Sequence, residues 1–161
     1  MIKRILITLI IVSCGLFANE PKSVKATQKW VKKNGYKIIH DFKTLLSIPN
    51  VAADRANIRK NAEYISELFQ SRGFDMQLLK VDGANPIIYG ELKRPGATRT
   101  LCFYVHYDGQ PVDETKWEHA PFEPVLYSGP MDGGGKPIPF PEKRTKINSE
   151  WRLYGRSAGD D

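Results

Sequence analysis

An uninterrupted apolar segment that ends in a polar cluster constrains the fold of this chain more than any other feature. Residues 101–105 are five apolar residues in a row, and their aromatic and branched side chains favour a strand that is buried on both faces. Such strands are typical of parallel sheets covered by helices, where ligands bind at the carboxyl ends of the strands. His106 and Asp108 follow directly, so we expect the functional site there.

The spacing of His106 and Asp108 favours direct contact between their side chains. In an extended chain, residues two apart project to the same side. A carboxylate that accepts one imidazole N–H fixes the tautomer and orients the other nitrogen outward, as is usual for a metal-bound histidine. These two residues alone leave a second interpretation open, an ordinary hydrogen-bonded pair in a loop.

The first eighteen residues have the organisation of a secretory signal peptide. Lys3 and Arg4 precede an apolar segment, residues 5–17, and Ala18 is a small residue before a polar stretch. The apolar segment is shorter than the roughly 20 residues that a helix needs to cross a bilayer. We favour cleavage after Ala18; the alternative is a bacterial lipobox that ends at Cys14, which would then carry the lipid.

Residues 19–161 have the length and element pattern of one modest α/β domain. Apolar residues at three- and four-residue spacing predict two helices, and Asp54 and Gly73 are suitable residues for the start and the end of the second one. The sequence Asn34-Gly35 is a candidate interruption of the first helix. The predicted elements are helices over residues 23–46 and 54–72, strands over 74–81, 86–92 and 101–105, and a short strand after residue 150. Their order predicts a mixed sheet with helices.

Five lysines cluster at the start of the first predicted helix, in a chain whose formal net charge is +6. They are Lys22, Lys25, Lys29, Lys32 and Lys33. No nucleic-acid motif accompanies them, so we predict no nucleic-acid partner. We interpret them as a solvated helix face, with the neighbourhood of an anionic membrane as one setting.

Three further residues with reactive side chains receive structural interpretations. Cys102 is the only cysteine outside the signal peptide, which excludes an intrachain disulfide, and we expect it to be a small buried apolar residue of the strand. We expect His40 to be at the surface or half-buried on its helix, and His119 to be on the surface of a loop. Neither histidine is predicted to be a ligand.

Two separated motifs together resemble a known enzyme family. They are His-Tyr-Asp-Gly-Gln-Pro-Val over residues 106–112 and Leu-Tyr-Gly-Arg-Ser-Ala-Gly-Asp-Asp over residues 153–161. The pair resembles the zinc-dependent exopeptidase and deacylase family that includes carnosinase-type dipeptidases, glutamate carboxypeptidases, aminoacylase and succinyl-diaminopimelate desuccinylase. The loop over residues 117–124, with Trp followed by Pro-Phe-Glu-Pro, is similar to that of the dipeptidase branch. The resemblance extends from about residue 30 to residue 161.

The resemblance implies a fold and a metal site. The fold would be α/β, the amino-terminal part of a three-layer αβα zinc-peptidase catalytic domain with a mixed sheet. His106 would bind one metal, Asp108 would be the catalytic residue that orients this histidine, and Asp160 would bridge two metals. The cofactor would be two zinc ions, with cobalt or manganese as alternatives. Two such ions polarise the scissile carbonyl and activate a water molecule.

Two departures from the family pattern qualify what we expect. Ser157 occupies a position where many members have glycine. The family's remaining ligands, its catalytic glutamate and its lid domain lie downstream of the paired aspartates, so we expect the chain to be an incomplete fragment that is inactive alone. The parent protein would be an exported, periplasmic or secreted hydrolase of small peptides or N-acyl amino acids, with a homodimer as one possible assembly. The alternative is a non-catalytic exported binding domain.

Overall fold

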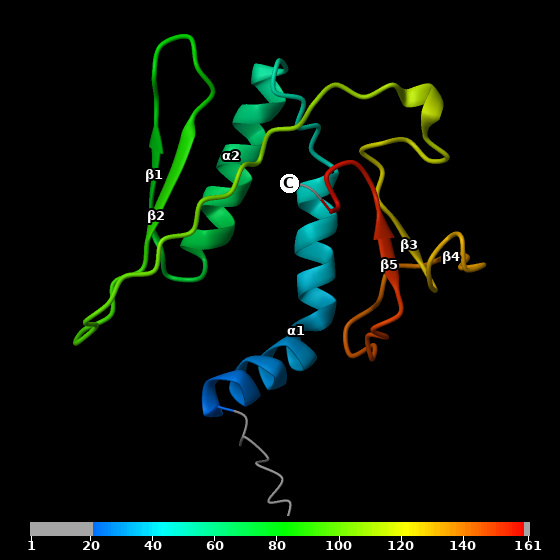
Figure 1. Cartoon of the computed structure of the whole chain (residues 1–161), viewed down its shortest axis with the longest axis horizontal. Helices are drawn as coiled ribbons and strands as arrows, with labels where there is room; N and C mark the ends of the chain where they lie inside the picture. The colour runs from blue at the N-terminus through cyan, green and yellow to red at the C-terminus, as the bar shows by residue number, and fades with distance from the viewer. Residues whose placement is uncertain (1–20, 160–161) are drawn as a thin grey trace, which may run out of the picture. The chain divides into compact units, whose positions relative to one another are not determined.

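A computed structural model describes residues 21–159 of the chain, which divides into two units, Met1–Lys33 and Asn34–Asp161. The predicted signal peptide, with Cys14, and the proposed bridging residue Asp160 lie outside the described residues. No helix within residues 21–159 is long and apolar enough to cross a membrane. The elements in chain order are α1 (Lys22–Leu46), α2 (Arg55–Gln70), β1 (Asp75–Leu79), β2 (Ile87–Glu91), η1 (Glu114–Lys116), β3 (Val125–Tyr127), β4 (Pro137–Ile138) and β5 (Arg152–Tyr154) (Figure 1).

Helix α1 is continuous, so the predicted interruption at Asn34-Gly35 is wrong. A Cβ on Gly35 would lie 2.8 Å from Cγ1 of Ile147. The glycine therefore lets a later loop lie directly against the helix, and tertiary packing outweighs its low helix propensity. The helix ends at Leu46, and Pro49 follows shortly afterwards, as the sequence predicts.

Helix α2 begins at its predicted capping residue and ends two residues before the predicted end. The side chain of Asp54 accepts a hydrogen bond from the backbone N–H of Asn57 at 3.1 Å. After the helix, Gly73 has a φ of 88°, a left-handed conformation that glycine adopts without strain. The inner side of the helix carries Ile58 and Ala62, both with no exposed surface, so this stripe belongs to the core.

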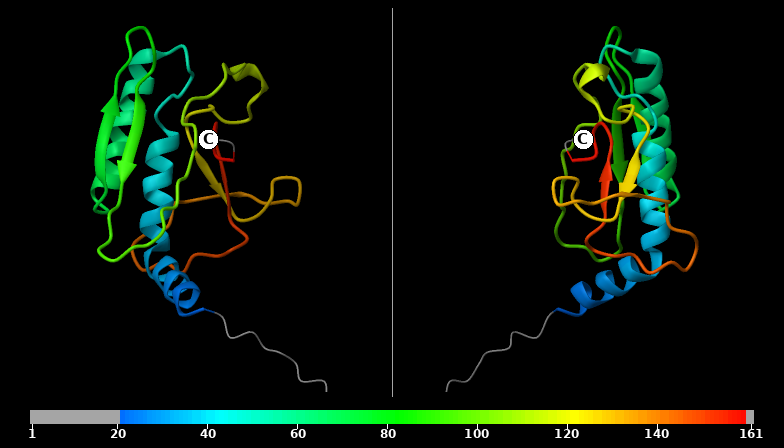
Figure 2. Two further views of the ribbon diagram at one scale, coloured as in Figure 1. Left: turned by 60° about the vertical axis from the view of Figure 1, so that its left-hand side comes forward. Right: turned by 90° about the vertical axis from the view of Figure 1, so that its right-hand side faces the viewer.

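Strands β1 and β2 form an antiparallel pair in which Asp75 lies opposite Glu91 and Leu79 opposite Ile87. Helix α2 packs against this pair (Figures 1 and 2). The rings of Phe69 and Phe74 meet edge to face at a centroid distance of 5.2 Å, which closes the turn between α2 and β1.

A second, three-stranded antiparallel sheet has the order β4-β3-β5. Its central strand β3 carries Leu126 and Tyr127, which are 2% and 3% exposed. The ring of Tyr127 packs edge to face on that of Tyr154 in β5 at 5.1 Å. A small core of its own therefore holds this sheet, which Figure 2 shows separate from the β1–β2 pair.

The described residues form two helices and two small antiparallel sheets, which is compatible with the predicted α/β class, but two finer predictions are wrong. Every strand pair in the described sheets is antiparallel, so they form no mixed sheet. Residues 101–105 belong to no strand, and Leu101, Phe103, Tyr104 and Val105 are 81–93% exposed. Cys102 is exposed too, where a buried position was expected. A strand buried on both faces needs neighbours that donate and accept hydrogen bonds, and within residues 21–159 this run has no such partner.

Candidate functional site

His106 and Asp108 lie together at the end of the apolar run, with side chains that are 48% and 44% exposed. Nδ1 of His106 is 3.0 Å from the backbone oxygen of Asp108 and 4.0 Å from its carboxylate oxygen Oδ1. A carbonyl oxygen can only accept, so Nδ1 donates this bond. The predicted partner residue is right, but the acceptor is its backbone rather than its carboxylate.

This hydrogen bond selects the tautomer of His106. With the proton on Nδ1, the neutral ring carries its lone pair on Nε2. A histidine that donates one ring N–H to a backbone carbonyl and uses its other nitrogen as a ligand is a common arrangement at metal sites. The chemistry of His106 therefore fits a zinc ligand.

The segment after His106 is anchored on two sides. The hydroxyl of Tyr107 donates to the backbone oxygen of Pro86, just before β2, at 2.5 Å. Burial raises the pKa of the Tyr107 hydroxyl, and the negative charge of Asp108 raises it further. Tyr107 therefore keeps its proton, which it needs in order to donate this bond.

Gly109 extends the anchoring to the loop between α1 and α2. It forms a parallel bridge with Val51: the N–H of Gly109 donates to the oxygen of Asn50 at 2.7 Å, and the N–H of Ala52 donates to the oxygen of Gly109 at 2.9 Å. These bonds fix the backbone immediately after Asp108. The position of His106 is therefore set by its C-terminal neighbours rather than by the strand that was expected to precede it.

Asn50 joins the two motif segments through its side chain, which is 5% exposed. Its Nδ2 donates to the oxygen of Tyr107 at 3.2 Å and to Oγ of Ser157 at 2.8 Å. The hydroxyl of Ser157 is in turn 3.2 Å from Oδ1 of Asn50. One buried amide thus bonds to residue 107 in the first motif and residue 157 in the second.

Arg156 makes a second connection between the motifs. Its Nη2 donates to the oxygen of Gln110 at 3.4 Å, and its backbone N–H donates to the oxygen of Pro121 at 2.6 Å. The neighbouring Ser157 has a φ of 68°, in the left-handed region that favours glycine. This conformation is a physical reason for a glycine at this position, and the buried bond to Asn50 accounts for the serine found here.

Asp160, the proposed bridging ligand, lies outside the described residues, three positions after Ser157. Between residues 21 and 159, no group of three or more histidine, cysteine, aspartate or glutamate side chains is arranged to hold a metal ion. The described part of the site is thus one histidine, its orienting residue and the anchored segment that would lead to Asp160.

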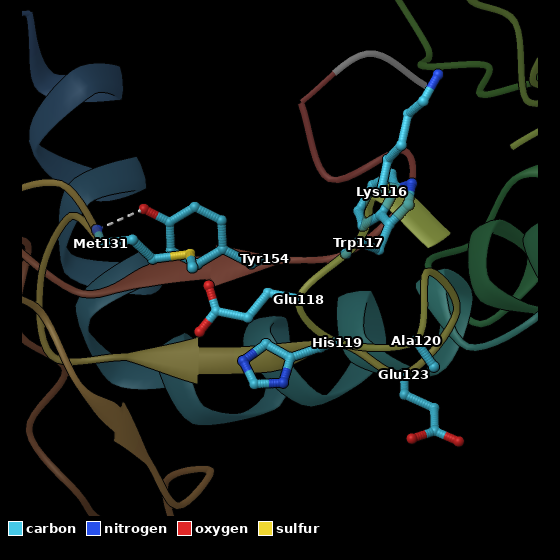
Figure 3. Close-up of a pocket in the computed structure, with 9 residues that line it drawn as sticks. Lys116, Trp117, Glu118, His119, Ala120, Glu123, Met131 and Tyr154 are labelled. Atoms are coloured by element: carbon cyan, nitrogen blue, oxygen red, sulfur yellow. Dashed lines mark hydrogen bonds between the residues drawn. The ribbon is translucent and has the colours of Figure 1, made fainter. Parts of the chain in front are cut away.

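A separate hollow of about 420 Å³ lies beside β5 and the loop over residues 117–124 (Figure 3). Its lining includes Trp117, Glu118, His119 and Tyr154. In this view the carboxylate of Glu118 lies between the rings of Tyr154 and His119. The lining of the hollow thus combines charged and aromatic side chains.

His119 has a structural partner that the sequence did not reveal. Its Nε2 is 2.6 Å from the hydroxyl of Tyr127. Burial raises the pKa of this hydroxyl, with smaller contributions from Glu118 and Tyr154, so Tyr127 keeps its proton. The neutral hydroxyl can donate to Nε2 or accept from its N–H, and the tautomer of His119 decides between the two. His119 is half-buried rather than on the loop surface, and it fastens the loop to β3. Because Tyr127 lies on another element, the spacing of residues around His119 does not indicate this contact.

His40 is half-buried on α1, as predicted. Its Nε2 is 2.8 Å from the backbone oxygen of Pro141, to which it donates. The rings of Tyr36 and Phe140 lie 5.1 and 6.0 Å from its ring. The histidine therefore connects α1 to the loop after β4.

No protein-family model matches this chain, and no solved structure matches it.

Proposed function

We propose that this chain contributes the histidine-bearing part of a two-zinc amidohydrolase site. The tautomer of His106 supports the proposal, because its Nδ1 donates to the backbone oxygen of Asp108 and its Nε2 carries the lone pair. Imidazole nitrogen is among the ligands that zinc prefers, and a ring held from its other nitrogen loses less freedom when it binds.

The observation that carries the proposal is the link through Asn50. The two motifs that suggested a shared metal site are 41 or more residues apart in sequence, yet one buried side chain bonds to both Tyr107 and Ser157. A chance match of two short motifs gives no reason for the segments to meet. The link supports a common site that includes His106, close to the segment that leads to Asp160.

The proposal gives each residue a role. His106 would hold one metal through Nε2, Asp108 would keep the ring in orientation, and Asp160 would be the ligand shared by the two metals. When bound, the zinc pair supplies polarisation of the scissile carbonyl and a water molecule of lowered pKa. A catalytic zinc normally has three protein ligands, so the other ligands and the general base belong to sequence other than residues 21–159.

The substrate class follows from the family resemblance. We propose an amide bond in a dipeptide or an N-acyl amino acid, hydrolysed outside the cytoplasm by a protein that the signal peptide exports. Cobalt or manganese in place of zinc remains compatible with the same ligand types. The 161-residue chain on its own is expected to bind zinc weakly and to hydrolyse none of these substrates.

Nitrogen NMR of the imidazole rings tests the metal assignment directly, because the chain contains only three histidines. Long-range ¹H–¹⁵N spectra report which ring nitrogen carries the proton and which one binds a metal. We expect a protonated Nδ1 in His106, and a shift of its Nε2 signal when zinc is added. His40 and His119 are internal controls, because their Nε2 atoms are engaged by Pro141 and Tyr127 and should not shift.

Two results would contradict the proposal. One is a zinc titration that moves the signals of His40 or His119 and leaves those of His106 in place. The other is unchanged zinc affinity in a His106→Gln variant that retains the far-UV circular dichroism of the parent. Turnover of dipeptides by the purified 161-residue chain would contradict the narrower statement that the chain is inactive alone.

A further inference from the structure

The first turns of α1 carry lysines along one side. At 3.6 residues per turn, the five lysines between residues 22 and 33 fall within an arc of about 100° on the helix surface. All residues from 21 to 33 are exposed. We call this arc the lysine face; it consists of Lys22, Lys25, Lys29, Lys32 and Lys33.

The opposite side of the same turns carries exposed apolar side chains. Val24, Trp30 and Val31 are 39%, 52% and 47% exposed, and the same helical spacing places them outside the lysine face. The small residues Ser23, Ala26 and Thr27 and the polar residue Gln28 fill the rest of this side. The turns are therefore amphipathic, although no residue in them is buried.

The charge of this stretch is positive throughout. Residues 21–40 contain no aspartate or glutamate, although Glu20 directly precedes them. The next acidic residue along the chain is Asp41, which forms ion pairs with Lys37 at 2.7 Å and Arg72 at 3.3 Å. No carboxylate within this stretch therefore offsets the lysine face. Its natural counterpart is an array of anionic groups.

We propose that the first turns of α1 bind the surface of an anionic lipid bilayer, with the helix axis parallel to the membrane. The apolar side would enter the interface, and the lysines would extend their long side chains to the lipid phosphates. A basic polar side with Trp and Val on the other side is the composition of such interfacial helices. This contact needs no lipid on Cys14, and it holds whatever reaction the rest of the chain supports.

Nucleic acid is the other anionic partner to consider. It would engage the lysine face alone and would leave Val24, Trp30 and Val31 in water. A bilayer interface uses both sides of the helix, since it offers phosphates at its surface and acyl chains directly beneath them. The exposed apolar side chains therefore favour the lipid surface.

Co-sedimentation with lipid vesicles tests the proposal on the full chain. We expect binding to vesicles of phosphatidylcholine with phosphatidylglycerol to exceed binding to pure phosphatidylcholine, and to weaken with added salt. Each lysine near an anionic leaflet strengthens partition roughly fivefold, so the triple variant Lys25→Glu, Lys29→Glu, Lys32→Glu should lower it by about a hundredfold or more. The matched control makes the same change of charge at exposed positions outside α1, with Lys136→Glu, Lys143→Glu and Lys146→Glu.

Two further measurements separate the alternatives. Trp30→Ser leaves the charge unchanged and should weaken vesicle binding severalfold, because it removes the largest apolar side chain. The corresponding Lys→Gln triple variant should also lose binding, which guards against misfolding caused by the charge reversals. The apolar residues 5–17 are the same in every variant, so they cannot produce the differences.

Three outcomes would overturn the proposal. Equal binding to vesicles with and without phosphatidylglycerol would exclude an anionic surface. Equal losses in the α1 variant and in its control would mean that net charge, rather than the lysine face, is responsible. Binding to duplex DNA that depends on the lysine face but not on Trp30, without vesicle binding, would assign the surface to nucleic acid.

Discussion

Replacing Asn50 by alanine is the most direct test of the link between the two motif segments. The variant loses the bond from Nδ2 to Tyr107 and the paired contacts with the hydroxyl of Ser157. Asn50 is 5% exposed and Ser157 8% exposed, so water cannot readily replace the lost partners. The predicted effect is on the free energy of unfolding, and through it on the arrangement of both motifs.

The expected magnitude follows from these contacts. A neutral hydrogen bond contributes about 0.5–1.5 kcal/mol net, and a buried polar group left without its partner costs about 1–3 kcal/mol. Asn50→Ala should therefore lower the free energy of unfolding by about 2–4 kcal/mol. The matched control is Asn85→Ala, which removes a single bond from Nδ2 to the oxygen of Ala52 and should cost about 1 kcal/mol.

Urea unfolding followed by tryptophan fluorescence and circular dichroism measures both variants, provided that the slope with denaturant is unchanged. A double-mutant cycle with Ser157→Ala should give a coupling energy of about 1 kcal/mol between the two positions. A link between the motif segments through Asn50 is refuted if Asn50→Ala costs no more than the control, or if Asn50→Ala and Ser157→Ala are additive.

Three other predictions concern single positions. The free energy of unfolding in urea should be higher for Ser157→Gly than for Ser157→Ala by about 1 kcal/mol, because both lose the bond to Asn50 but only glycine relieves the positive φ; equal values would contradict this. Hydrogen bonds from Asn57 hold the pKa of the Asp54 carboxyl below its usual 3.8. The stability that the ionised carboxylate contributes is therefore present above pH 3.8 and is lost as the pH falls below that value. The Asp54→Asn variant should lose less stability over the same acid range. Cys102 should react with a thiol reagent as fast in native buffer as in urea. Slower reaction in buffer would instead support the prediction of a buried strand.

The two helices and the strands β1 and β2 could be predicted because their determinants are local, whereas the antiparallel pairing of these strands was not predicted. Asp54 caps α2 through a residue three positions away, and Gly73 ends that region through its own backbone conformation. Periodicity and turn residues are visible in a short window of sequence. The predicted strands 74–81 and 86–92 accordingly contain β1 and β2.

The predictions that failed depended on partners far away in the chain. The apolar run over residues 101–105 has the composition of a buried strand, but its burial requires neighbours that its own sequence does not specify. The sequence predicts a surface position for His119, but its partner Tyr127 lies on the next strand, across a loop. Composition describes what a segment can become, and tertiary contacts decide which of those states forms.

The candidate site was predictable at the level of residue types and not of contacts. Adjacency in sequence was enough to pair His106 with Asp108, but the accepting atom is a backbone oxygen. The role of Asn50 had no signal, because an asparagine after a proline looks like an ordinary turn residue. Only the folded chain shows that its amide reaches both motifs.

The exposed run beside His106 affects how the chain behaves at high concentration. Its five side chains have high strand propensity and carry no charge, and such segments readily stack into intermolecular β-structure. Collisions between molecules, rather than unfolding, would then limit the lifetime of a concentrated solution. A lysine in place of Tyr104, which is 93% exposed, would act as a gatekeeper and raise solubility without disturbing the anchored residues that follow.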